Sequence, residues 1–157
     1  MRRKILPLIV SHGIAAIVGF AAGIYLLPIL IAPAAPSESD VQAVATQSRY
    51  TGEFRRDLED SDPLHWGEGT VFVSAYSIAL DGKIAPGPDY RLYLSPEFVE
   101  TEADFEKLKA TMTEIGDVKT FENFLVSVPA GVDINDYSSV IVWCESFGEF
   151  ITAARYR

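Results

Sequence analysis

Cysteine and histidine are almost absent from this sequence of 157 residues. Cys144 is the only cysteine, and His12 and His65 are the only histidines. A single cysteine excludes an intramolecular disulfide, and the lack of a Cys-x-x-Cys-His motif excludes covalent c-type haem. The motifs Gly-x-Ser-x-Gly and His-Glu-x-x-His are missing, as is a phosphate-binding glycine loop. These absences argue against hydrolytic and zinc-dependent activities, and we predict no metal site.

Basic residues are also scarce. The chain has 13 Lys and Arg against 22 Asp and Glu, and three of the basic residues form the N-terminal cluster Arg2-Arg3-Lys4. The remaining 10 basic residues leave residues 5–157 with a formal charge of −12. So acidic a surface repels phosphate backbones. We therefore predict no nucleic-acid partner.

A long uncharged apolar segment occupies residues 5–31. As a helix it would measure about 40 Å, more than the ~30 Å of a bilayer's hydrocarbon core. The apolar region of a secretory signal has only about 7–15 residues, so an uncleaved signal anchor is favoured, although Ala32-Pro-Ala34 resembles a cleavage site. Residues 1–4 are expected to stay in the cytoplasm because positive charge is retained there. We predict a single-pass protein of the cell inner membrane with a periplasmic or extracellular domain.

The apolar segment carries a pattern that can pair helices. Ala15, Gly19 and Gly23 recur at every fourth position, and small residues at this spacing let two helices approach closely. Because glycine and alanine are common in membrane helices, the pattern also fits an unpaired helix. A helix-mediated homodimer is one interpretation.

The rest of the chain divides into a linker and a β-rich domain. Residues 32–48 are rich in Ala, Pro, Ser and acidic residues and are expected to form a flexible stalk. Residues 49–157 contain several short alternating or apolar runs separated by turn residues, typical of strands. We predict an all-β fold, an antiparallel sandwich or barrel with one inserted helix. The expected elements are a run at 70–80 that turns at Asp81-Gly82, strands at 83–85, 91–95, 121–128, 139–144 and 149–156, and a helix at 102–112 capped by Thr101.

Cys144 ends the apolar run Val140-Ile141-Val142-Trp143, which is typical of a buried strand. A reactive thiolate requires exposure and a positive neighbour, whereas the flanking residues are Trp143 and Glu145. From the residues alone, Cys144 is a redox thiol, a ligand to a metal or haem iron, an intermolecular partner, or an inert core residue.

The order of several short motifs resembles the DM-thirteen domain family. The C-terminal run around Cys144 carries the strongest likeness, and the remaining motifs precede it in the family's order: Gly52-Glu-Phe54, Gly69-Thr70-Val71 after His65, Gly87-Pro88-Asp89-Tyr90-Arg-Leu92-Tyr-Leu94-Ser95, and Val128-Pro129. The segment 97–120 departs from the family pattern in being long and helical. The resemblance implies an electron-transfer role centred on Cys144, with His65 as a second ligand candidate.

These observations lead to one functional hypothesis and one alternative. We predict a membrane-anchored redox or electron-transfer accessory in which Cys144 is the reactive thiol, a carrier rather than a catalyst. Haem held by His65 or Cys144 is a candidate cofactor. The expected partners are the lipid bilayer, contacted through residues 5–31, and a redox or membrane protein. The alternative is a noncatalytic binding or assembly module in which Cys144 only packs the core.

Overall fold

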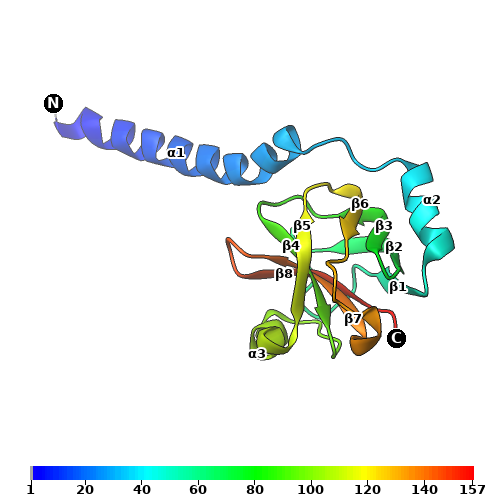
Figure 1. Ribbon diagram of the computed structural model, residues 1–157. Helices are drawn as coiled ribbons and strands as arrows, with labels where there is room; N and C mark the ends of the chain where they lie inside the picture. Colours follow the sequence, from blue (N-terminus) through cyan, green and yellow to red (C-terminus); the bar gives the residue numbers. More distant parts are fainter. Residues whose placement is uncertain (1) are drawn as a thin grey trace.

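The computed structural model describes residues 2–157, with a long helix leading into a compact β domain (Figure 1). Helix α1 (Arg2–Ile31) contains the apolar stretch Ile5–Ile31, which has a mean hydropathy of 2.5 and is not buried within the protein. Its length and composition suit a membrane-spanning helix or a signal sequence.

The stretch between α1 and the β domain contains a second helix, which corrects the expectation of a flexible stalk. Helix α2 (Glu38–Gln47) is capped by Ser37, whose hydroxyl accepts a hydrogen bond from the Asp40 amide while the Asp40 carboxylate accepts one from the Ser37 amide. Val41 and Val44, three residues apart, are buried against Ala79. The sequence of α2 is mostly polar because only Val41 and Val44 contact the sheet. The N-terminal cap stabilises the helix in addition to this contact.

The β domain consists of two four-stranded antiparallel sheets, so the expected antiparallel β architecture is confirmed. The first sheet has the order β1-β2-β3-β6, formed by β1 (Tyr50–Phe54), β2 (Gly67–Val73), β3 (Ser77–Ile84) and β6 (Glu122–Ser127). The second has the order β5-β4-β7-β8, formed by β5 (Thr113–Val118), β4 (Tyr90–Ser95), β7 (Ser139–Cys144) and β8 (Glu149–Arg155).

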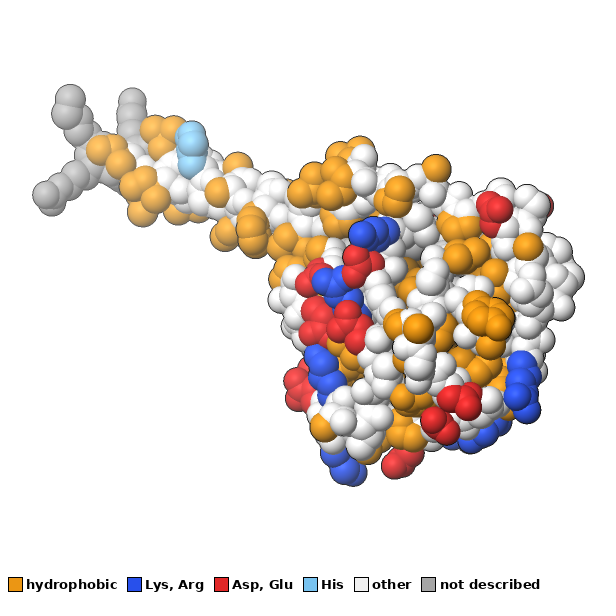
Figure 2. Space-filling model, in the orientation of Figure 1, with side chains coloured by type: hydrophobic (Ala, Val, Ile, Leu, Met, Phe, Trp, Pro, Cys, Tyr) orange, Lys and Arg blue, Asp and Glu red, His pale blue; other side chains and the backbone are white. Residues whose placement is uncertain are grey.

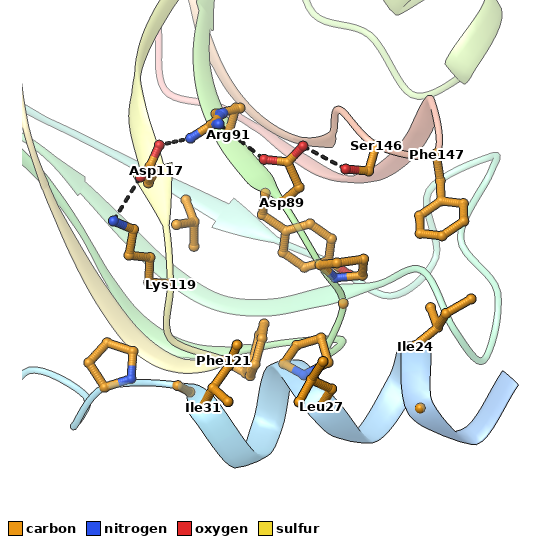
Figure 3. Close-up of a pocket in the computed structure, with 18 of the residues that line it drawn as sticks. Ile24, Leu27, Ile31, Asp89, Arg91, Asp117, Lys119, Phe121, Ser146 and Phe147 are labelled. Atoms are coloured by element: carbon orange, nitrogen blue, oxygen red, sulfur yellow. Dashed lines mark hydrogen bonds and ion pairs between the residues drawn. The ribbon is translucent and has the colours of Figure 1, made fainter. Parts of the chain in front are cut away.

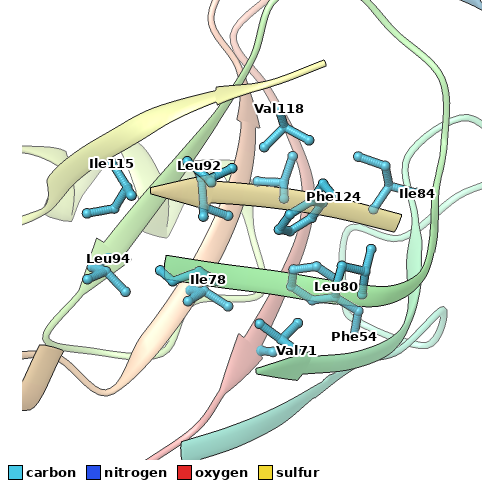
Figure 4. Packing of buried hydrophobic residues seen from close by; sticks show 14 of the residues in the cluster. Phe54, Val71, Ile78, Leu80, Ile84, Leu92, Leu94, Ile115, Val118 and Phe124 are labelled. Carbon is cyan, nitrogen blue, oxygen red and sulfur yellow. The ribbon is translucent and has the colours of Figure 1, made fainter. Parts of the chain in front are cut away.

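The main core lies between the two sheets (Figure 4). Leu80 and Phe124 enter it from the first sheet, and Leu92 and Leu94 enter it from the second. Alternate residues of each strand point to one face, so this inner face is apolar. The sandwich buries its core without any disulfide.

The Asp81-Gly82 pair lies inside β3 and forms no turn, contrary to the sequence-based expectation. The chain turns instead at residues 74–76, and β3 continues through Ile84. Gly82 pairs with Gly69 of β2, and a Cβ on Gly82 would lie 2.1 Å from the Glu68 carbonyl oxygen. Glycine is therefore required here for the close approach of two strands.

The segment 97–120 is only partly helical. Thr101 caps α3 (Glu102–Leu108) as predicted, its hydroxyl accepting from the Asp104 amide at 3.1 Å, and a 3-10 turn, η1 (Lys109–Thr111), follows. The remainder is β5, which the sequence analysis missed. β5 pairs with β4 across a register shift at Leu92 and Tyr93, and this irregularity obscures its alternation.

Strand β7 is buried along its whole length, because both faces of its sheet are covered. Val140, Val142 and Cys144 face the main core, whereas Ile141 and Trp143 face a smaller core under α3. A strand covered on both faces is continuously apolar and does not alternate. Another short 3-10 turn, η2 (Ile134–Asp136), precedes β7.

Candidate functional site

Cys144 is the last residue of β7, and its side chain is 2% exposed. Its thiol donates a hydrogen bond to the carbonyl oxygen of Pro88, with Sγ and O 3.0 Å apart. The chain then makes a tight turn in which the Gly148 amide donates to the Cys144 carbonyl at 2.9 Å. Gly148 has a φ of +68°, a conformation that suits glycine. The turn holds the thiol at the rim of the sandwich core.

The surroundings of Cys144 favour the protonated thiol. Burial raises its pKa, and the nearby carboxylates of Asp89 and Glu149 act in the same direction. Backbone amides of Phe147 and Ser146 oppose this effect without cancelling it. Cys144 is therefore a hydrogen-bond donor at neutral pH and a weak nucleophile.

Glu145, which the sequence placed beside the thiol, is engaged elsewhere. The Lys109 ammonium donates to both of its carboxylate oxygens at 2.8 Å, and the Tyr93 hydroxyl also donates to it. Burial raises the pKa of Glu145, but hydrogen bonds from Lys109 and Tyr93 outweigh it and leave the pKa below its ordinary value. The ion pair ties η1 to the turn after β7.

His65 lies in the loop before β2, where Asp62 organises the backbone. The Asp62 carboxylate accepts from the amides of Leu64 and His65 at 2.6 and 2.7 Å, and it lies 3.1 Å from His65 Nδ1. The imidazole is 26% exposed. A carboxylate at Nδ1 leaves Nε2 as the nitrogen available to a ligand, as in many metal-binding histidines.

The fold brings Cys144 and His65 to the same cavity, although 78 residues separate them in the sequence. The cavity has a volume of about 390 Å³. Helix α1 forms one wall with Ala21, Ile24 and Tyr25. The β domain supplies the other walls: Leu64, His65, Pro86, Gly87, Pro88, Tyr90, Cys144, Phe147, Glu149 and Ile151. No cluster of three His, Cys, Asp or Glu able to hold a metal ion occurs within residues 2–157.

The family of this chain follows from the stretch that contains both cavity residues. The family model described as electron transfer DM13 matches residues 57–156. The chain belongs to the DM13 family. The match confirms the family resemblance; Gly52-Glu-Phe54, in β1, lies before the matched stretch. No curated protein and no solved structure matches the chain.

Tyr90 is a cavity residue of the DM13 domain that sequence reasoning did not select. It pairs directly with Cys144 across β4 and β7, so both side chains lie on one face of the sheet. Tyr90 is 3% exposed, and its hydroxyl lies against Gly87, where a Cβ would come within 2.2 Å of it. Burial is the main cause that raises its pKa, and a Cys144 thiolate would raise it further. In the sequence, Tyr90 occupies the same alternating positions as Leu92 and Leu94 and therefore resembles another core residue. Only the pairing of β4 with β7 shows that it lies beside Cys144.

A second and larger cavity, of about 870 Å³, lies between α1 and the DM13 domain (Figure 3). Leu27 and Ile31 lie on the helix beside Phe121 of the domain, and Ile24 lies on the side of Phe147. The cavity shares five residues with the Cys144 cavity: Ile24, Gly87, Pro88, Tyr90 and Phe147. The two cavities therefore adjoin at these five residues.

One end of the larger cavity carries charged side chains that already pair with one another. Arg91 lies 3.0 Å from Asp89 and 3.7 Å from Glu114, and it also contacts Asp117. Lys119 lies 2.8 Å from Asp117. Figure 2 shows acidic and basic side chains intermingled on the domain beside the helix. Three carboxylates therefore surround two cations, and the group has no positive excess.

Proposed function

We propose that the protein is a membrane-anchored electron-transfer accessory whose working site is the cavity shared by Cys144 and His65. One observation carries the proposal: the only cysteine and the only histidine of the β domain line the same cavity in a domain of the electron transfer DM13 family. The family resemblance implied a role for Cys144 and for His65 separately. In the structure both residues line one cavity.

Membrane anchoring is supported by α1. Its apolar stretch Ile5–Ile31 can cross a bilayer, and the preceding Arg2-Arg3-Lys4 cluster favours a cytoplasmic N-terminus. The acidic domain then lies outside the cytoplasm, in the periplasm or extracellular space, where it is held beside the inner membrane. Gly19 and Gly23 line the larger cavity, so a helix-mediated dimer through them would compete with the domain for this face.

The chemistry available to Cys144 requires a partner. The chain has no second cysteine, so a disulfide cycle within it is excluded. A protonated, buried thiol also reacts slowly with soluble oxidants. The electron donor or acceptor must therefore be a molecule or iron centre that enters the cavity. If haem entered the cavity, His65 Nε2 or Cys144 Sγ would hold its iron, and the haem would supply the one-electron chemistry.

A noncatalytic binding or assembly module is the second candidate. The hydrogen bond from the Cys144 thiol to the Pro88 carbonyl favours it, because this contact suits a cysteine that only packs and joins two loops. In that case the cavity would bind a partner while Cys144 stayed reduced.

The two candidates differ in what Cys144 does during turnover. The full chain in detergent would be examined by visible spectroscopy and by maleimide titration, then mixed with membrane extracts held under oxidising or reducing conditions. A Soret band, or a Cys144 oxidation state that follows the redox potential of the extract, supports electron transfer. A colourless protein whose thiol stays reduced and reacts only after unfolding contradicts it. Cys144→Ser preserves a hydroxyl donor to Pro88 and is the matched control.

A further inference from the structure

Leu64 and Phe147 are the most exposed leucine, isoleucine, valine or phenylalanine side chains of the β domain, at 55% and 54%. Leu64 lies in the loop before β2, and Phe147 lies in the turn between β7 and β8. Both side chains line the Cys144 cavity, so the fold gathers them at one place. We call this pair the apolar edge. Exposed apolar side chains that gather on a surface mark a contact with a membrane or with another protein.

The length of α1 fixes where the helix leaves a bilayer. The uncharged stretch Ile5–Ile31 follows the basic cluster Arg2-Arg3-Lys4, which favours the cytoplasmic surface. About 20 helical residues cross the ~30 Å hydrocarbon core, so a crossing that begins at Ile5 ends near Ile24. The last two turns of α1 then pass through the headgroup layer.

The apolar edge lies beside this exit point. Phe147 lies on the Ile24 side of the larger cavity, as Figure 3 shows. Leu64 shares the Cys144 cavity with three residues of the same part of the helix, Ala21, Ile24 and Tyr25. The two exposed apolar side chains are therefore the part of the domain nearest to the boundary of the hydrocarbon core.

Charged side chains of the same face lie farther out along α1. Figure 3 shows Asp117 and Lys119 toward Ile31, at the opposite end of the larger cavity from Phe147. The helix rises about 10 Å between Ile24 and Ile31, whereas the headgroup layer on one side of a bilayer is only ~5–8 Å thick. These charges therefore stay outside the hydrocarbon core. From Phe147 to Lys119 the face changes from apolar to charged, as a bilayer does from its core to water.

The charge of the domain indicates which lipids suit this contact. Residues 5–157 have 10 basic against 22 acidic side chains, a formal charge of −12. The two cations nearest to the helix, Arg91 and Lys119, are already paired with carboxylates. An anionic lipid surface would repel this domain, whereas a zwitterionic surface would not.

We propose that the apolar edge docks on the outer surface of the bilayer that α1 crosses, with Leu64 and Phe147 in the interfacial layer of zwitterionic lipids. Burial of apolar side chains in this layer stabilises the contact. The rim of the Cys144 cavity then lies at the level of the lipid headgroups. The docking rests on the membrane anchoring of the proposed function and not on its redox chemistry.

Fluorescence quenching can measure the contact on the full chain in phosphatidylcholine nanodiscs. All proteins carry Cys144→Ser, and Ser146→Cys introduces the labelling site for nitrobenzoxadiazole at an exposed position beside Phe147. Tyr76→Cys carries the reference label, at a residue that is 79% exposed. Tyr76 precedes the eight-residue strand β3 and Pro86 of the Cys144 cavity follows it, so about 25 Å of strand separates the two ends. A headgroup nitroxide lipid should quench the Ser146→Cys label several-fold more than the Tyr76→Cys label.

Charged substitutions test whether the two apolar side chains make the contact. Phe147→Glu and Leu64→Glu each bring a carboxylate to the interface and should remove most of the excess quenching of the Ser146→Cys label. Tyr76→Glu makes a comparable change at the opposite end of β3 and should leave the quenching unchanged. Because all three side chains are exposed, each variant should keep the circular dichroism spectrum of its parent.

The outcomes separate docking from anchoring. Equal quenching of the two labels in a chain that elutes with the nanodiscs overturns the docking alone. Undiminished quenching in both Phe147→Glu and Leu64→Glu also overturns it, as does stronger quenching in phosphatidylglycerol than in phosphatidylcholine. A chain that does not elute with the nanodiscs overturns the anchoring and the docking together. The redox role of Cys144 is not touched by these results, because the thiol is replaced in every protein.

Discussion

The indole of Trp143 and the ring of Phe105 are stacked, with centroids 4.0 Å apart and planes inclined by 11°. This contact joins α3 to the outer face of β7, one residue before Cys144. Phe105 is fully buried, and it also meets the Tyr93 ring edge-on at 5.2 Å. The inserted helix is therefore part of the support of the Cys144 strand.

Phe105→Ala should lower the free energy of unfolding by about 3–5 kcal/mol, because it leaves a cavity between α3 and the sheet. Denaturant unfolding of the full chain in detergent measures this loss. Phe98→Ala, at a partly buried position of the same cluster, should cost less. Equal costs for the two variants would contradict the central position assigned to Phe105.

Glu145→Gln should weaken the fold at neutral pH and reduce its acid sensitivity. The folded-state pKa of Glu145 lies below its ordinary value of 4.5, so the ionised carboxylate stabilises the fold above that pH. This contribution is lost as the pH falls through the folded-state pKa. The variant loses hydrogen bonds from Lys109 and Tyr93 to a charged acceptor, at a cost of about 1–2 kcal/mol at pH 7.

Unfolding free energies at pH 7 and in mild acid test this prediction. Wild type should lose more stability on acidification than Glu145→Gln. Glu106→Gln, at an exposed position of α3, provides the control and should match wild type at both pH values. An acid loss as large in Glu145→Gln as in wild type would assign the effect to other carboxylates.

Asp89→Asn should make Cys144 more reactive. The Asp89 carboxylate is one cause of the raised thiol pKa, after burial, so removing its charge lowers that pKa and increases the thiolate fraction. Asp89 has a φ of +55°, a conformation that asparagine also tolerates. We expect native maleimide labelling at pH 8 to accelerate roughly twofold or more.

A control variant separates the effect of the lost charge on the labelling rate from the effect of a less stable fold. Asp81→Asn changes an exposed carboxylate of β3 and should label like wild type. If Asp89→Asn labels faster only in proportion to a lower unfolding free energy, the electrostatic explanation is wrong.

Thr152→Val should stabilise the protein by about 1 kcal/mol. The Thr152 hydroxyl is fully buried in β8 and has no hydrogen-bond partner in the described part of the chain. Replacing it by a methyl group removes a desolvated polar atom at nearly constant shape. Thr70→Val, which removes a hydroxyl that donates to Glu53 at 2.9 Å, should not stabilise. A destabilised Thr152→Val would show that the hydroxyl is satisfied, for instance by water.

Local sequence signals predicted the features that depend on neighbours in the chain. The run ending at Cys144 is a strand with the predicted bounds. Thr101 caps helix α3, as predicted. Helix α2 was missed although Ser37 and Asp40 form its cap, because two valines alone carry its apolar edge. The Asp81-Gly82 pair was misread because a turn and a close strand contact both favour glycine.

Composition and short periodic patterns are enough to establish the single free thiol, the acidic charge, the long apolar helix and the β-rich character of the domain. The folded chain is needed to see that Tyr90 pairs with Cys144, that His65 lines the same cavity, and that α1 forms one of its walls. These relationships depend on strand register and on packing between distant segments, which side-chain periodicity within one segment does not specify.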